Sequence, residues 1–160
     1  MFQGLADGSA GLGTFGHGYT YSGHPVPAAV AVETLKIYDE IDIVGHVRRV
    51  APSLQEGLRS RFADHPLVGE IRGVGLIAAV EFVSNRDTRA NFDPALKFAP
   101  RLVKIAEGHG LIMRALPGDG IAFSPPLIIT ADEVNDMLDR FGRALDELTV
   151  QLRRESLASV

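Results

Sequence analysis

The chain has 160 residues, a net charge of −4, no cysteine, no tryptophan and only three lysines. This length suits one domain with a hydrophobic core, and 46% apolar residues is a globular composition. The absence of cysteine excludes disulfides, cysteine-ligated zinc and a thiol nucleophile. The mildly acidic, evenly spread charge argues against nucleic-acid or membrane partners, and no apolar run has the length of a membrane span. Without the basic flank of a signal peptide, we expect a cytoplasmic protein.

The N-terminal segment is rich in glycine. Seven of the 17 glycines lie within residues 4–23. Because glycine favours irregular backbone, this spacing predicts a long loop. A short apolar piece at residues 1–5 is consistent with the end of a helix.

Two helices are expected after this loop. Pro25 and Pro27 suit a first helical turn, where the missing N–H costs nothing. Residues 28–41 are apolar on nearly every face, which predicts a buried helix. Residues 43–63 carry a single apolar stripe and predict a second helix. Pro52 within it predicts a kink or a division into two helices.

The second half of the chain contains four short strand patterns. Residues 67–72 and 75–83 predict two strands, and the second is expected to be central because both of its faces are mostly apolar. Residues 111–114 and 121–123 predict two more strands, joined by a Gly/Pro turn.

Two further helices complete the predicted order. One ends near Gly108 and begins either at Pro94 or later, because Pro100 obstructs an uninterrupted start. The last is opened by a capping box at Thr130 and Glu133 and has a clear apolar stripe. We expect the final residues, 156–160, to fray. The whole order predicts an α+β fold: a small antiparallel or mixed sheet with helices packed on it.

Some familiar motifs are absent or lack their context. Gly11–Gly16 fits the dinucleotide fingerprint G-x-G-x-x-G, but no strand pattern precedes it, so we reject this function. The five histidines show no metal-ligand spacing, and we expect no metal site. The serine-hydrolase motif G-x-S-x-G is missing.

Two segments have the chemistry to bind an anion. Residues 16–25 place hydroxyl groups ahead of a predicted helix N-terminus, where Thr20 or Ser22 could donate to a bound anion. The same loop could equally do no more than cap its own helix. Arg114 stands at a strand end beside a Gly/Pro turn and could clamp a carboxylate through two hydrogen bonds. Alternatively, it is an ordinary surface or ion-paired arginine.

Several motifs, in order along the chain, resemble class III (omega-type) aminotransferases. Residues 15–25 read FGHGYTYSGHP and precede an alanine-rich helix. The later motifs are RGVGL at 72–76, VEF at 80–82, GLIMR at 110–114 and SPPLIIT at 124–130. The resemblance covers almost the whole chain, and implies that it is the C-terminal part of an enzyme of fold type I, within the α/β family.

The resemblance also implies a division of the chain into three parts. Residues 1–23 would be the cofactor-phosphate loop at the end of a large domain. Residues 24–63 would be connecting helices, and residues 64–160 a small C-terminal α+β domain.

Members of this family use pyridoxal 5′-phosphate and form homodimers with active sites at the subunit interface. The resemblance implies that Thr20, with the amide near Tyr19, binds the cofactor phosphate of the other subunit. It implies that Arg114 pairs with a substrate carboxylate and swings aside for an uncharged amine. The full reaction would move an amino group from an amine or amino acid to a keto acid or aldehyde.

One essential residue of the family has no counterpart in this sequence. The Schiff-base lysine lies upstream of the threonine loop, whereas Lys36, Lys97 and Lys104 all follow Thr20. We therefore expect no catalytic residue here, an internal start at Met1, and no activity from the chain alone. The alternative is a non-catalytic ligand-binding or assembly module derived from such an enzyme.

Overall fold

The computed structural model describes residues 2–13 and 15–155, and the predicted fraying of 156–160 lies outside them. The chain divides into two compact units, residues 1–41 and 42–160. The boundary falls inside the segment predicted to hold the connecting helices. No helix among the described residues is long and apolar enough to cross a membrane.

The first unit begins with a helix, α1, over Phe2–Leu12. The loop predicted over residues 4–23 is therefore wrong in its first half. Each glycine weakens a helix by only about 1 kcal/mol, and alanine, leucine and an i,i+4 bond from Gln3 Nε2 to Asp7 Oδ1 (2.8 Å) favour it. Gly13, at φ +90°, ends the helix, so the G-x-G-x-x-G motif begins in the last turn of a helix instead of opening one.

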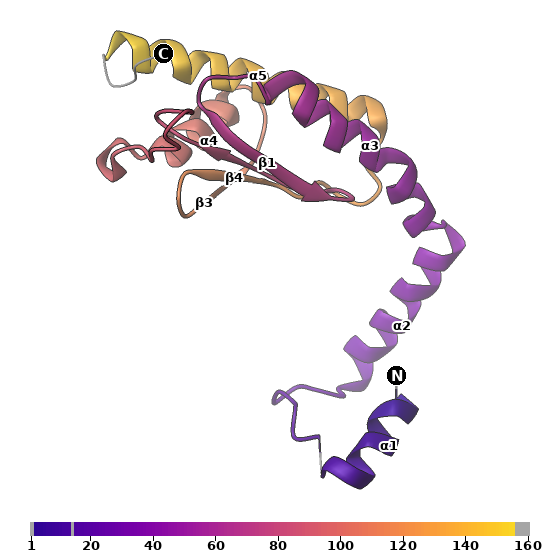
Figure 1. Cartoon of the computed structure of the whole chain (residues 1–160). Helices are drawn as coiled ribbons and strands as arrows, with labels where there is room; N and C mark the ends of the chain where they lie inside the picture. The colour runs from indigo at the N-terminus through magenta and orange to yellow at the C-terminus, as the bar shows by residue number, and fades with distance from the viewer. Residues whose placement is uncertain (1, 14, 156–160) are drawn as a thin grey trace. The chain divides into compact units, whose positions relative to one another are not determined.

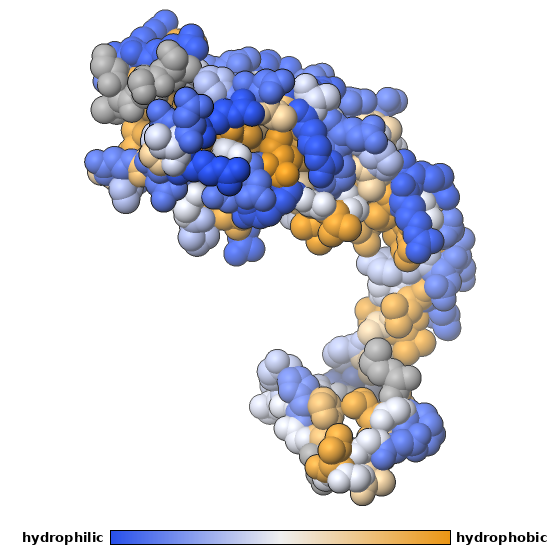
Figure 2. Space-filling view, viewed as in Figure 1, coloured by the Kyte–Doolittle hydropathy of each residue, from blue (hydrophilic) through white to orange (hydrophobic). Residues whose placement is uncertain are grey.

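The second helix of this unit, α2, spans Pro25–Glu40. Pro25 occupies its first turn as predicted, and His24 Nδ1 accepts the Val26 N–H at 3.3 Å. The prediction that this helix is buried is wrong, because α2 has no buried residue. Figure 2 shows apolar residues on its surface. Its large exposed apolar side chains are Val26, Val30, Val32, Leu35, Ile37 and Tyr38.

The second unit is built on a four-stranded sheet (Figure 1). Its strands are β1 (Val68–Val74), β2 (Ile77–Phe82), β3 (Arg114–Leu116) and β4 (Gly120–Phe123), in the order β1-β2-β4-β3. All three pairings are antiparallel, and β2 is interior, as predicted. Strand β3 begins at Arg114, where the predicted strand ended.

Three long helices pack with this sheet: α3 (Ile43–Phe62), α4 (Phe98–Gly108) and α5 (Ala131–Arg154). Helix α3 runs through Pro52 without division, so of the two predicted outcomes, a kink or a division, the division is wrong. Buried side chains before and after the proline, Val50 and Leu54, hold both halves against one core. The capping box at Thr130 is confirmed.

The start of α4 combines the two predicted alternatives. Asp93 caps a short 3₁₀ turn, η1 (Pro94–Leu96), through the Ala95 amide at 2.8 Å. Helix α4 then begins at Phe98 and has Pro100 in its first turn, where proline is tolerated.

The hydrophobic core lies on one face of the sheet, under the helices. Phe141 of α5 is fully buried, and its ring meets Phe62 and Phe123 edge-on with centroids 4.9 and 5.0 Å apart. Helices α3 and α5 approach closely at Gly57, where a Cβ atom would lie 2.6 Å from Leu138 Cδ1. Because alternate strand residues face this core, the remaining strand residues form a second face that the core does not use.

Candidate functional site

Two arginines stand at opposite edges of that second sheet face. The register aligns Arg72 of β1 with Ala79 of β2, Ala79 with Ala122 of β4, and Ala122 with Arg114 of β3. The neighbours of these residues along β2 and β4 are buried in the core, so the aligned row points the other way. Its two central residues are alanines, which leave space between the arginines.

Arg72 is neutralised by the protein itself. Its Nη1 donates to Glu81 Oε2 at 2.7 Å and lies 3.4 Å from Glu70 Oε2. The hydrogen bond to Glu81 raises the pKa of the Arg72 guanidinium above its usual value. Glu70 and Glu81 therefore both interact with the Arg72 guanidinium.

Arg114 has no such counter-ion. It is exposed at the first position of β3, and no carboxylate or hydrogen-bond acceptor of residues 2–13 and 15–155 bonds to its side chain. The ion-paired alternative considered from the sequence is therefore not observed within these residues. A guanidinium with all its donors free can take a carboxylate in a two-bond geometry.

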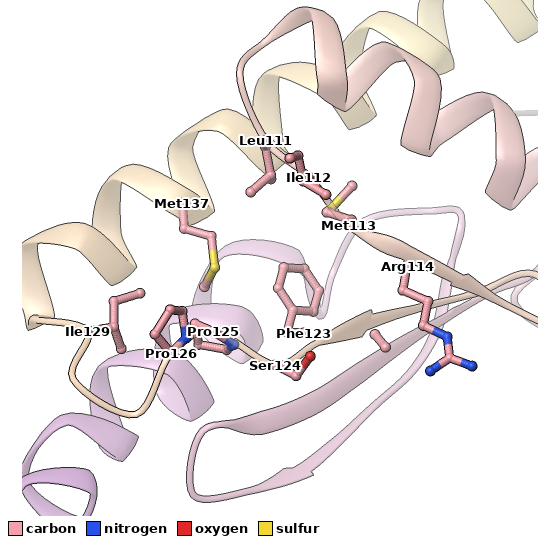
Figure 3. A pocket seen from close by; sticks show the side chains of 11 residues that line it. Leu111, Ile112, Met113, Arg114, Phe123, Ser124, Pro125, Pro126, Ile129 and Met137 are labelled. Carbon is pink, nitrogen blue, oxygen red and sulfur yellow. The ribbon is translucent and has the colours of Figure 1, made fainter. Parts of the chain in front are cut away.

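Arg114 lies at one end of a cavity of about 490 Å³. Figure 3 shows its guanidinium pointing away from Met137 and Ile129, which lie at the other end. A carboxylate bound by Arg114 would therefore sit on the sheet side of the cavity, and the apolar end would be left for an apolar group. The lining residues are Leu111–Arg114, Ala122–Pro126, Ile129 and Met137.

The loop of the first unit holds Thr20 in a turn closed at both ends. Ser22 N–H donates to the Tyr19 carbonyl at 2.9 Å, and Tyr19 N–H donates to Ser22 Oγ at 2.8 Å. The Thr20 hydroxyl and the amides of Thr20 and Tyr21 have no partner among the described residues. Of the donors predicted from the sequence, Thr20 is thus free, whereas the Tyr19 amide already has an acceptor.

Two of the three lysines form ion pairs, and the third lies at the junction of two helical segments. Lys36 and Lys104 form exposed pairs with Glu33 and Glu107 at 2.9 and 2.8 Å. The bond to Glu107 raises the pKa of Lys104, which is opposite to what an amine nucleophile needs. Lys97 has a positive φ of 51° at the junction of η1 and α4. Among the described residues there is no group of three or more side chains suited to a metal ion.

Sequence reasoning missed the contrast between the two arginines and the place of Ser124. Nothing in the spacing of Arg72 and Arg114 shows that they share a row, because register depends on how β2 pairs with β4. The signal available for Ser124 was its position as the first residue of SPPLIIT, directly after a strand pattern.

A family comparison identifies the chain. The model of the aminotransferase class-III family matches residues 5–145. The chain belongs to this family. The predicted family is therefore confirmed. Class III aminotransferases depend on pyridoxal phosphate.

Relatives and solved structures agree with this assignment. An uncharacterized aminotransferase, y4uB, of Sinorhizobium fredii is 43% identical over 97% of this chain and 33% of its own length. The chloroplastic gamma aminobutyrate transaminase 3 of Solanum lycopersicum is 45% identical over 85% of this chain and 26% of its own length. The omega transaminase of Pseudomonas jessenii, in a crystal structure with PMP, is 49% identical, with a TM-score of 0.79 over 94% of this chain and 33% of that one.

These likenesses confirm the predicted α+β fold. They also show that the chain spans only about a quarter to a third of the length of these relatives.

Proposed function

We propose that this chain supplies substrate-carboxylate recognition and part of the cofactor-phosphate site to a class III aminotransferase. The reaction would transfer an amino group from an amine or amino acid to a keto acid or aldehyde. The observation that supports this most directly is Arg114, exposed on the open sheet face and without a carboxylate partner among the described residues. Arg72, at the opposite edge of the same sheet face, is instead paired with Glu81 and Glu70.

Arg114 would bind the carboxylate of a keto or amino acid by two parallel hydrogen bonds. Because no bond within the described residues holds its side chain, it is free to turn away from an uncharged amine. The apolar end of the cavity beside it would accept the apolar part of the same substrate. Arg114 would thus allow both kinds of substrate at one site.

The turn at Tyr19–Ser22 has donors that fit a phosphate group. The Thr20 hydroxyl and the amides of Thr20 and Tyr21 are unpartnered among the described residues, and a phosphate accepts several such bonds. The Tyr19 amide could join them by exchanging Ser22 Oγ for the phosphate. Pyridoxal phosphate, when bound, supplies the electron sink that makes amino-group transfer possible. In a homodimer these donors would serve the cofactor of the other subunit.

The remaining assignments follow from the family and stay proposals. Residues 1–23 would close the large domain, 24–63 would connect, and 64–160 would form the small domain. A cytoplasmic location is likewise a prediction. None of the three lysines has the place or surroundings of the cofactor lysine, so we expect the chain by itself to be inactive.

Two measurements test the inactivity. The chain is incubated with pyridoxal phosphate and an amine donor, and cofactor absorbance and keto-acid turnover are followed. We expect no turnover. Turnover that is lost when Lys36, Lys97 or Lys104 is replaced would contradict the assignment.

The role of Arg114 is tested in an assembled enzyme. The chain is co-expressed with the upstream two thirds of a class III relative, and keto-acid and simple-amine substrates are compared. Arg114→Ala should lower kcat/KM for keto acids by about a hundredfold, the effect of losing a charged two-bond contact, and change amine use much less. Arg48→Ala, at an exposed arginine of α3, is the matched control. Equal losses for both substrates would remove the assignment.

A second function, an assembly module without catalysis, is supported by the exposed apolar side chains of α2. The same co-expression distinguishes the two. Restored turnover supports an aminotransferase part, whereas a stable complex without turnover supports the assembly module.

A further inference from the structure

We propose that Ser124 is a second carboxylate donor beside Arg114 and determines how well the site holds a carboxylate substrate. The inference rests on the proposed function of Arg114. The inference adds an uncharged residue, Ser124, to the site proposed around Arg114. Its basis is the cavity that Ser124 and Arg114 both line, the local backbone chemistry and the absence of another partner for the hydroxyl within the described residues.

Ser124 and Arg114 line the same cavity. Arg114 is paired with Ala122 of β4, and Ser124 directly follows Phe123, the last residue of that strand. Figure 3 shows both side chains on the side of β4 opposite to the ring of Phe123. A carboxylate bound in this cavity could accept a hydrogen bond from each of these side chains.

The space between these two donors is kept open by a small side chain. Ala122 lies opposite Arg114 on the same face, and all three residues line the same cavity. Neither Ser124 Oγ nor the Arg114 guanidinium bonds to any of residues 2–13 and 15–155. Two free donors therefore face one opening, while the acidic residues Glu70 and Glu81 are held by Arg72.

The two residues after Ser124 restrict its backbone and supply no N–H group that could compete with its hydroxyl for a carboxylate. Pro125 and Pro126 have no N–H, so neither can donate to a bound carboxylate. The residue before a proline is confined to extended backbone, which limits the directions open to the Ser124 side chain. The hydroxyl is thus the side-chain donor that residues 124–126 offer.

The loop that carries Ser124 is fixed at its other end. His46 Nε2 of α3 donates to the Ile129 carbonyl at 2.9 Å, across 83 residues of sequence. Ile129 N–H donates to the Pro126 carbonyl at 3.0 Å, and the Thr130 capping box follows. Ser124 is therefore held between strand β4 and an anchored turn, and its position does not depend on a ligand.

The test uses the full 160-residue chain and NMR, because no turnover is needed to observe carboxylate binding. The Arg114 Nε–Hε resonance is followed during titration with sodium pyruvate, with pyruvamide as the uncharged probe. Wild-type protein should show a saturable shift with pyruvate only. Ser124→Ala should raise the Kd about fivefold, which corresponds to the loss of one hydrogen bond. Ser124→Thr, which keeps the hydroxyl, should stay within about twofold of wild type.

The controls make each outcome decisive. Ser60→Ala removes an exposed serine of α3 and should leave the Kd unchanged. Amide spectra show that each variant is folded. An unchanged Kd in Ser124→Ala, with pyruvate still bound at Arg114, overturns the inference about Ser124 alone. Wild-type protein without any pyruvate-dependent shift overturns both this inference and the proposed role of Arg114.

Discussion

Helices α2 and α5 both contain many apolar residues, but they differ in how many of these are buried. In α5 they fall on one stripe, which supplies seven buried apolar residues, including Phe141 and Leu145. In α2 they are spread over every face, and none is buried. A helix packs on one core along one side, so the arrangement of apolar residues decides what this chain can cover. Apolar residues on nearly every face predicted a buried helix at α2, and this prediction was wrong.

The largest expected difference between the two units comes from a matched pair of leucine truncations. Leu145→Ala in α5 should lower the free energy of unfolding by about 2–5 kcal/mol, because it leaves a cavity in the core. Leu35→Ala in α2, where the side chain is 62% exposed, should change it by less than about 0.5 kcal/mol. Urea unfolding at several protein concentrations measures both. A large loss in Leu35→Ala that depends on concentration would show that α2 is covered by self-association.

A glycine substitution in each unit gives the next largest contrast. At Gly73 of β1 a Cβ atom would lie 2.5 Å from the Ile77 carbonyl oxygen and 2.8 Å from Ala78 Cα. Since these are backbone atoms of β2, Gly73→Ala should destabilise the second unit by about 1–3 kcal/mol. At Gly8 of α1 a Cβ meets nothing within 4 Å, and Gly8→Ala should only raise helicity. Unfolding curves and far-UV circular dichroism measure the two effects, and a stable Gly73→Ala would refute the close approach.

The N-terminal caps of α5 and α2 should differ more modestly. Thr130→Ala removes the bond from Glu133 N–H to Thr130 Oγ1 (3.2 Å) and should cost about 1 kcal/mol in global stability. His24→Ala removes the cap of α2 and should reduce helicity without shifting the main unfolding transition. If both variants shifted that transition equally, α2 would be part of the same cooperative core.

The smallest expected effect is a pH dependence confined to the second unit. His65 accepts the Leu67 N–H through Nδ1 at 3.2 Å, and burial lowers its pKa below 6.5, with Arg153 adding to this and Asp146 opposing it. The folded state therefore binds fewer protons than the unfolded state. The contribution of His65 to the free energy of unfolding is present above pH 6.5. It declines as the pH falls through 6.5 towards the lower pKa of His65 in the folded state.

His65→Asn tests this. Asparagine can still accept the Leu67 amide but does not titrate, so the variant should lose less stability than wild type between pH 7.5 and 5.5. Urea midpoints at each pH provide the comparison. Parallel decline in both proteins would place the pH dependence elsewhere.

The sequence by itself determined the family and most of the elements of the second unit. Periodic apolar stripes, the capping box and the Gly/Pro turns are local signals. They therefore allowed α5, β2 and the order of the strands along the chain to be predicted. The motifs around Thr20 and Arg114 indicated an anion-binding chemistry before any register was known. Local signals failed where the outcome depended on distant partners, as in the burial of α2 and the continuity of α3 through Pro52.

Only the tertiary structure decided which arginine is free. The sequence singled out Arg114 for its place at a strand end, but it left open whether Arg114 is ion-paired and said nothing of the pairing of Arg72. Strand pairing places Glu81 beside Arg72 and sets Ala122 opposite Arg114. Charge neutralisation is a matter of a few ångströms, and those distances are set by long-range register, which short-range sequence patterns do not encode.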